Sequence, residues 1–155
     1  HAMYRHYDNA VMDWCMHRWR QQRSGLPALP RDDLRRLVRA LREGRAIWYA
    51  PDQTLDPRHS VFAPFFGVPA LTVTATSRLA RMGRARVLPY MPQRTARGWR
   101  IRFFPMLDEF PGEDEGRDAT RVNEAIEAGV RLAMPEYFWV HKRFKRRPPG
   151  AAEVY

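Results

Sequence analysis

Apolar residues recur with the period of an α-helix in four stretches of this chain. The clearest stretch has apolar side chains at positions 34, 37, 38 and 41, and a glycine at position 44 that is typical of a helix end. Acidic residues at positions 32 and 33 suit the positive end of its dipole. Helices are therefore predicted over about residues 9–23, capped by Asp8, over 33–43, over 69–82, and from Asp118 or Thr120 to about Met134.

Shorter apolar runs between these helices predict strands. Residues 46–49 are apolar and rich in strand-forming types, which predicts a buried strand that Pro51 ends. Residues 85–90 predict a second strand, and the alternation over 98–104 favours a half-buried antiparallel or edge partner. The order of elements predicts an α/β fold, a mainly parallel sheet flanked by helices, in one domain spanning residues 1–155.

Two polar residues stand at the end of the first predicted strand. Asp52 and Gln53 directly follow Pro51, and loops at the carboxyl ends of strands carry ligand sites in α/β sheets. A loop rich in phenylalanine follows and includes Phe65 and Phe66. The combination indicates a site for an apolar ligand with a polar head. A hydrophobic plug under the loop, with Asp52 as a turn or cap carboxylate, explains the same residues.

The charge of the chain points to anionic partners. The net charge is +10, and most cations are arginines, whose planar guanidinium binds phosphate and carboxylate in bidentate fashion. The segment after residue 140 adds Lys142, Arg143, Lys145, Arg146 and Arg147, which predicts a surface for anionic head groups or an acidic protein.

Other classes of chemistry find little support. The single cysteine, Cys15, excludes a disulfide framework, the scattered histidines predict no metal site, and no nucleotide-binding glycine motif occurs, so no cofactor is predicted. No apolar run approaches the length of a membrane-spanning helix. A basic chain also fits a nucleic-acid binder, but no recognised motif supports one, and nucleic acid is not a predicted partner.

Several short motifs together resemble the lipid A biosynthesis lauroyl/myristoyl acyltransferases, a branch of the lysophospholipid acyltransferase superfamily. The closing run P-E-Y-x-W-x-H-x-R-F-K is the most specific of them. In chain order the motifs are Tyr4-Arg5, Asp8-Asn9, Trp14, W-Y-A-P-D-Q at 48–53, V-F-x-P-F-F-G at 61–67, Pro89-x-x-Pro92, and the closing run with its continuation at 135–148. The resemblance covers essentially the whole chain.

The resemblance implies a lysophospholipid or glycerol-phosphate acyltransferase-like fold and a specific reaction. A fatty acyl chain would pass from an acyl carrier protein thioester to a hydroxyl of a Kdo-modified lipid A precursor. The reaction would take place at an anionic membrane surface, the cytoplasmic face of a Gram-negative inner membrane. By position in the family pattern, Arg5 would contact acceptor phosphate, Asp52 and Gln53 would line the acceptor site, and Phe65 and Phe66 would border the acyl groove.

One departure from the family pattern concerns catalysis. The family signature is a histidine followed five positions later by Asp or Glu, which supplies the general base. The residues five positions after the five histidines are His6, Val11, Gln22, Pro64 and Arg146, so none is acidic. We therefore expect no catalytic residue in this chain, which would be the C-terminal part of such a domain, incomplete at its N-terminus. A non-catalytic binding module for anionic lipid or acidic carrier protein, or a degenerate paralogue, is the alternative.

Overall fold

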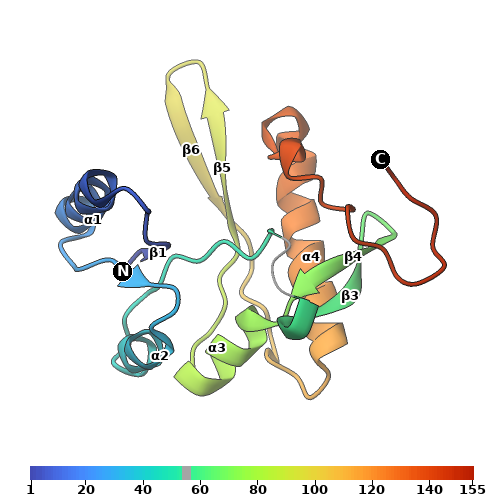
Figure 1. Ribbon diagram of the computed structural model, residues 1–155, viewed down its shortest axis with the longest axis horizontal. Helices are drawn as coiled ribbons and strands as arrows, with labels where there is room; N and C mark the ends of the chain where they lie inside the picture. The colour runs from blue at the N-terminus through green and yellow to red at the C-terminus, as the bar shows by residue number, and fades with distance from the viewer. Residues whose placement is uncertain (54–56) are drawn as a thin grey trace. The chain divides into compact units, whose positions relative to one another are not determined.

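A computed structural model describes residues 1–53 and 57–155, and the chain divides into two compact units (Figure 1). The first unit comprises His1–Ala50 and Arg81–Ala85, and the second comprises Pro51–Ala80 and Arg86–Tyr155. Helix α3 (Ala75–Gly83) therefore begins in the second unit and ends in the first. The expectation of one domain spanning residues 1–155 stays a prediction.

The first unit contains two helices, as the sequence predicts. Helix α1 (Ala10–Ser24) and helix α2 (Leu34–Arg42) follow the two strands of a short parallel pair, β1 (Met3–Tyr4) and β2 (Leu29–Pro30). The cap of α1 is Asn9 rather than Asp8, because the Asn9 side chain accepts both the Val11 and Met12 amides at 3.0 Å.

Helix α2 is the best packed helix of the first unit. Leu37 is 1% exposed and Ala40 is also buried, but Leu34 is 46% exposed, so the predicted apolar stripe is confirmed only in part. The helix lies directly against the end of α3, because a Cβ at Gly83 would come within 2.6 Å of the Leu41 Cβ. The glycine at position 83 therefore allows the two helices to approach at close range.

The predicted buried strand at 46–49 is wrong. Among the described residues of this run, only Trp48 forms a ladder contact, an isolated parallel bridge to Ala2. Trp48 is 43% exposed, and the Arg20 guanidinium lies 5.8 Å from the centre of its ring. Four apolar residues cannot form a strand in the middle of a sheet without partners on both sides, and β1 offers only a short edge.

The second unit is built around a hairpin that the sequence analysis assigned to a loop. Strands β3 (Ser60–Phe65) and β4 (Val68–Val73) pair antiparallel across a two-residue turn, Phe66-Gly67. Both turn residues have positive φ, 50° and 76°, as a primed hairpin turn requires. The phenylalanine-rich segment is therefore mostly sheet, and residues 54–56 of the predicted loop lie outside the described residues.

The predicted helix over 69–82 is correct only in its second half. Residues 69–73 belong to β4, where leucine, threonine and valine at 71–73 fit a pleated, buried surface. Helix α3 begins at Ala75, after Thr74. The apolar spacing of the segment fitted a helix, but its β-branched residues favour the strand that forms.

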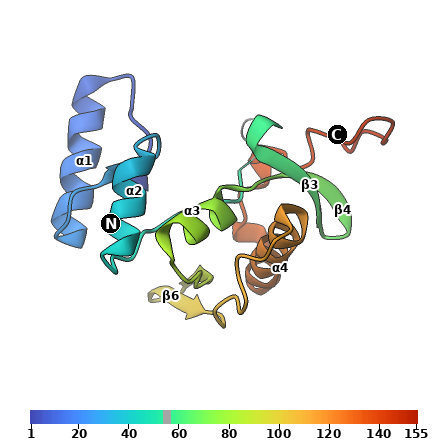
Figure 2. The same cartoon turned by 90° about the horizontal axis from the view of Figure 1, so that it is seen from below.

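Helix α4 (Glu115–Leu132) covers one side of the β3–β4 hairpin, as the view from below shows (Figure 2). Asp114 caps it by accepting the Gly116 amide at 2.7 Å, so the helix starts earlier than the predicted Asp118 or Thr120. Phe65, Ala70 and Val130 form the buried centre between hairpin and helix. This layer of one hairpin and one helix is the hydrophobic core of the unit.

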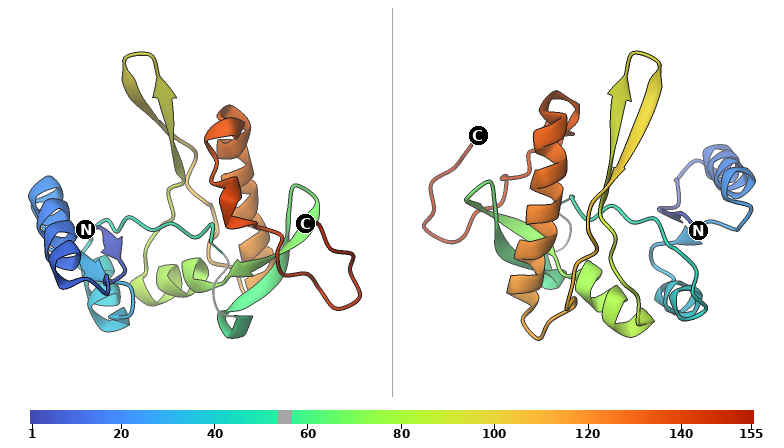
Figure 3. Two further views of the ribbon diagram at one scale, coloured as in Figure 1. Left: turned by 45° about the horizontal axis from the view of Figure 1, so that its top comes forward. Right: turned by 180° about the vertical axis from the view of Figure 1, so that it is seen from behind.

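A second hairpin lies beside α4 (Figure 3). Strand β5 (Tyr90–Thr95) pairs antiparallel with β6 (Gly98–Phe103), which confirms the strand predicted at 98–104 and its antiparallel pairing. The expected half-burial is wrong, because all six residues of β6 are exposed. The strand predicted at 85–90 is wrong in its bounds, because β5 begins where that prediction ends and runs through Pro92. Proline is compatible with a two-stranded hairpin because an edge strand can lack one amide donor.

The mainly parallel sheet is not confirmed. Within residues 1–53 and 57–155, the ladders are one parallel pair of two-residue strands and two antiparallel hairpins. The α/β class itself agrees with this mixture of helices and short sheets. Over the same residues, no helix combines the length and apolar character needed to cross a membrane.

Candidate functional site

Four ionisable side chains of the second unit lie close enough to influence one another. Asp52 is half-buried just after Pro51, and its negative charge acts on Tyr137, His141 and Arg143. We call Asp52, Tyr137, His141 and Arg143 the Asp52 cluster. Asp52 and the closing P-E-Y-x-W-x-H-x-R motif, more than eighty residues apart in the sequence, therefore lie near each other in the second unit.

Tyr137 and His141 are both held in their neutral forms. Burial, with the Asp52 charge adding to it, raises the pKa of Tyr137 to about 12. Burial also lowers the pKa of His141, assisted by the nearby positive charges of Lys145 and Arg143. At neutral pH the cluster therefore contains a neutral phenol and a neutral imidazole beside the Arg143 guanidinium.

Arg143 is the structural centre of the cluster and is 2% exposed. Its guanidinium donates to the Leu71 carbonyl at 2.6 Å, to Thr72 Oγ1 at 2.9 Å and to Asn123 Oδ1 at 3.3 Å. It also lies 5.4 Å from the centre of the Phe65 ring, a favourable position for a cation. Burial lowers the pKa of this guanidinium, and the charges of Tyr137 and Asp52 oppose that change.

Asn123 completes the network from helix α4. Its side-chain amide donates to the Pro64 carbonyl at 2.8 Å and to Thr72 Oγ1 at 3.0 Å. Strand β3, strand β4, helix α4 and the C-terminal segment are thus joined through two fully buried polar side chains. Such a network fixes the segment that carries Tyr137 and His141 in a defined position.

The prediction that residues 142–147 form a surface for anionic partners is corrected by the burial of Arg143. Arg143 belongs to the core, and Arg147 is half-buried with its guanidinium donating to the Pro69 and Ala152 carbonyls. Guanidinium groups held by hydrogen bonds within the protein are less open to a head group. Lys142, Lys145 and Arg146 are exposed, so they alone remain candidates for that surface.

The two phenylalanines predicted to border an acyl groove differ in their surroundings. Phe65 is 0% exposed and packs edge-on against Phe66 and beside Tyr137 and Phe144, so it is a core residue. Phe66 is half-buried in the turn, where its amide donates to Glu127 Oε1 at 2.7 Å. Of the pair, only Phe66 presents surface to a ligand, and Gln53 beside Asp52 is exposed as well.

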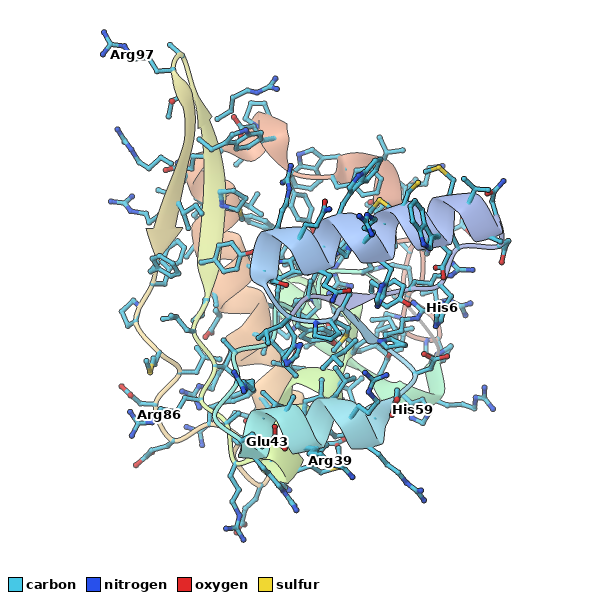
Figure 4. The ribbon with its side chains drawn as sticks, turned by 90° about the vertical axis from the view of Figure 1, so that its left-hand side faces the viewer. His6, Arg39, Glu43, His59, Arg86 and Arg97 are labelled. Atoms are coloured by element: carbon cyan, nitrogen blue, oxygen red, sulfur yellow. The ribbon has the colours of Figure 1, made fainter. Side chains whose placement is uncertain are left out.

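Arg5 lies in the first unit, in the loop between β1 and α1. It is exposed and lines a cavity of about 300 Å³ together with His6, Tyr7 and Asp8. His6, labelled in Figure 4, has its Nδ1 3.1 Å from Asp13 Oδ2. The Tyr7 amide, which donates to this carboxylate, and His6 together lower the pKa of Asp13.

Sequence reasoning missed the polar core of the second unit. Asn123 and Thr72 were not singled out, and Tyr137 was quoted only within a motif. One signal was present: positions 119, 122, 123, 126 and 130 form a single helical stripe, and Asn123 is its polar member. A polar residue on a buried stripe requires a hydrogen-bonding partner, which here is Arg143.

Comparison with known proteins places these motifs in a family. The family model of bacterial lipid A biosynthesis acyltransferases matches residues 1–146. The chain is 38% identical to the lipid A biosynthesis lauroyltransferase of Escherichia coli K12, over 99% of this chain and 51% of that protein. It is 35% identical to a lipid A biosynthesis acyltransferase of Haemophilus influenzae (95% and 48%) and 31% identical to the myristoyltransferase of Escherichia coli K12 (99% and 48%).

The chain spans about half the length of the curated relatives it matches. The match nevertheless includes Arg5, the Asp52 cluster and both hairpins, because it runs through residue 146. The chain therefore belongs to the bacterial lipid A biosynthesis acyltransferase family.

Proposed function

We propose that this protein takes part in lipid A biosynthesis as an acyltransferase. The acyl donor is an acyl carrier protein thioester, and the acceptor is a hydroxyl of a Kdo-modified lipid A precursor at the cytoplasmic face of the inner membrane. The names of the relatives, lauroyltransferase and myristoyltransferase among them, support acyl transfer to lipid A. The net charge of +10 supports an acidic carrier protein and a phosphorylated acceptor.

The observation that carries the proposal is the Asp52 cluster. A half-buried carboxylate with a neutral phenol and imidazole near it offers hydrogen-bond acceptors and donors suited to sugar hydroxyls. The Asp52 charge acts on the buried Arg143, whose guanidinium is held by Leu71, Thr72 and Asn123. We assign Asp52 and Gln53 to the acceptor side of the transfer cleft and the exposed edge of Phe66 to the acyl groove.

The exposed cationic side chains are assigned to anionic groups of the substrates. Arg5 is exposed on its cavity, and we assign it to an acceptor phosphate, where a guanidinium binds two oxygens at once. Lys142, Lys145 and Arg146 are assigned to carrier protein or head groups. We place the histidine base of the reaction outside this chain, because none of its histidines has an acidic residue five positions later.

A chimeric enzyme tests the proposal directly. The half of the Escherichia coli lauroyltransferase that aligns with this chain is replaced by this chain, and the chimera is expressed in a strain lacking its own lauroyltransferase. Mass spectrometry of lipid A should show the gain of one acyl chain. A chimera that accumulates as a folded protein and leaves the lipid A unacylated would contradict the proposal and favour a degenerate paralogue.

The purified chain provides the complementary measurement. Incubated with acyl carrier protein thioester and lipid A precursor, it should bind the precursor without transferring the acyl group. Precursor binding by the isolated chain together with an inactive chimera would identify a non-catalytic binding module. Failure of both binding and chimeric transfer would remove the acceptor-site assignment altogether.

A further inference from the structure

The two faces of the β5–β6 hairpin have different environments. On one face, Met91 packs against α4, close enough that a Cβ on Gly129 would lie 2.5 Å from the Met91 Cε. On the same face, the Gln93 side chain donates to the Leu132 carbonyl at 3.3 Å. The alternating burial of β5 shows that the opposite face has no cover from the second unit.

The uncovered face is apolar. The register pairs Tyr90 with Phe103 and Pro92 with Ile101, so these side chains share one face. Backbone hydrogen bonds continue the hairpin beyond β5 and β6, and Leu88 falls on the same face. Trp99, Ile101 and Phe103 are 65%, 56% and 62% exposed. We call this surface the bare hairpin face; its members are Leu88, Tyr90, Pro92, Trp99, Ile101 and Phe103.

Arginines surround the bare hairpin face. Residues 84–107 contain six arginines and no acidic residue. Arg97 points away from the rest of the unit at the tip of the hairpin, as Figure 4 shows, and the Arg94 guanidinium lies 5.4 Å from the centre of the Trp99 ring. Arg94 pairs with Trp99 and therefore lies on this face, whereas Arg100 and Arg102 pair with Gln93 and Met91 and are exposed on the opposite face.

We propose that the bare hairpin face docks on an anionic lipid bilayer, with its apolar side chains in the interface and Arg94 and Arg97 on the head groups. Tryptophan, tyrosine and arginine are the side chains that suit this boundary, because each joins apolar surface to a polar or charged group. A nucleic acid would be contacted mainly by the arginines and would leave Leu88, Ile101 and Phe103 in water. An anionic membrane satisfies the charge and the apolar surface together.

The inference rests in part on the membrane location of the proposed function and names the surface responsible for it. Its test uses vesicles without any acyl donor, so a failure of docking and a failure of acyl transfer are separately observed. The intact chain is sedimented with vesicles of phosphatidylcholine alone and with vesicles that also contain phosphatidylglycerol. Binding should be strong only to the second kind and should weaken as salt is raised.

Paired variants identify the surface. Ile101→Ser and Phe103→Ser should each weaken vesicle binding by about tenfold or more, because burying one such side chain in the bilayer raises the binding constant by about that factor. The matched control is Leu34→Ser, an exposed apolar residue on α2, which should leave binding unchanged. Replacing Arg94 and Arg97 by Gln should weaken binding more than the same change at Arg35 and Arg39, because both changes lower the net charge equally but only the first pair lies at the hairpin face.

Fluorescence distinguishes insertion from adsorption. Brominated phospholipids should quench the emission of the intact chain on binding, and Trp99→Phe should remove most of that quenching while circular dichroism stays unchanged. Equal quenching in Trp99→Phe, or equal loss from the two arginine pairs, would overturn the proposal. A lipid-free dimer that Phe103→Ser dissociates would also overturn it, because the face would then bind a second copy of the chain.

Discussion

Replacing Arg143 by methionine tests whether the polar core holds the C-terminal segment in place. Methionine keeps most of the volume and apolar stem of arginine and removes the hydrogen bonds that the guanidinium donates. The bonds to the Leu71 carbonyl at 2.6 Å and to Thr72 Oγ1 at 2.9 Å are short, and the one to Asn123 Oδ1 at 3.3 Å is longer. The contact with the Phe65 ring is lost as well.

The expected loss follows from these bonds. Two hydrogen bonds from a charged donor to buried acceptors contribute about 3–6 kcal/mol. Removing the buried charge offsets part of this loss, because the free energy needed to take the guanidinium out of water is no longer spent. The net loss in the free energy of unfolding should therefore be about 2–4 kcal/mol.

Urea unfolding followed by circular dichroism measures this loss. The control is Arg146→Met, an exposed neighbour whose replacement should change stability by about 0.5 kcal/mol or less. Arg143→Met that is as stable as the unaltered protein would refute the structural role. In that case Arg143 would again be a candidate for binding an anionic ligand.

Three further outcomes are expected. Leu37→Ala should cost about 2–5 kcal/mol in urea unfolding because the side chain is fully buried; a negligible cost would mean that α2 is poorly packed. The folded state raises the pKa of Tyr137 from 10.0 to about 12, so the stability that this shift contributes is complete below pH 10 and is lost as the pH rises toward 12. Tyr137→Phe should flatten that decline, and an unchanged pH profile would disprove the shift. In the chimeric enzyme, Arg5→Ala should reduce acyl transfer more than Arg36→Ala, whose side chain lies 3.8 Å from Asp33 on an exposed helix face; equal effects would remove Arg5 from the acceptor site.

Helices were predictable from the sequence where an apolar stripe and a cap agreed. Leu37 and Ala40 lie on the buried side of α2, and Asp33 caps it by accepting the Arg36 amide. The stripe and the cap are local features, within one or two turns of the chain, so sequence spacing captures them.

Strands were harder to predict because their partners lie elsewhere in the chain. The run at 46–49 has the composition of a strand but meets only a short edge of another strand. Strand β3, in contrast, forms although it contains Pro64, because this residue pairs with Pro69 across a hairpin. A turn with positive φ at Phe66 and Gly67 brings those strands together. Apolar composition alone does not indicate such pairing.

The candidate site was predictable only in part for the same reason. The motifs around Asp52 and the C-terminal segment were both recognised, but nothing local to either shows that they meet. The sequence also gives no sign that Arg143 is buried while Lys142 and Lys145 are exposed. That distinction depends on Asn123 and Thr72, which come from other elements of the fold.

The most direct test of the proposed acceptor site is the effect of Asp52→Asn on acyl transfer by the chimeric lauroyltransferase. The change keeps the size of the side chain and removes the charge that acts on Tyr137, His141 and Arg143. Steady-state rates with saturating acyl carrier protein thioester should show a large loss of kcat/KM for the lipid A precursor, with the urea midpoint nearly unchanged. Full activity in a stably folded Asp52→Asn enzyme would contradict the assignment of this cluster to the acceptor site.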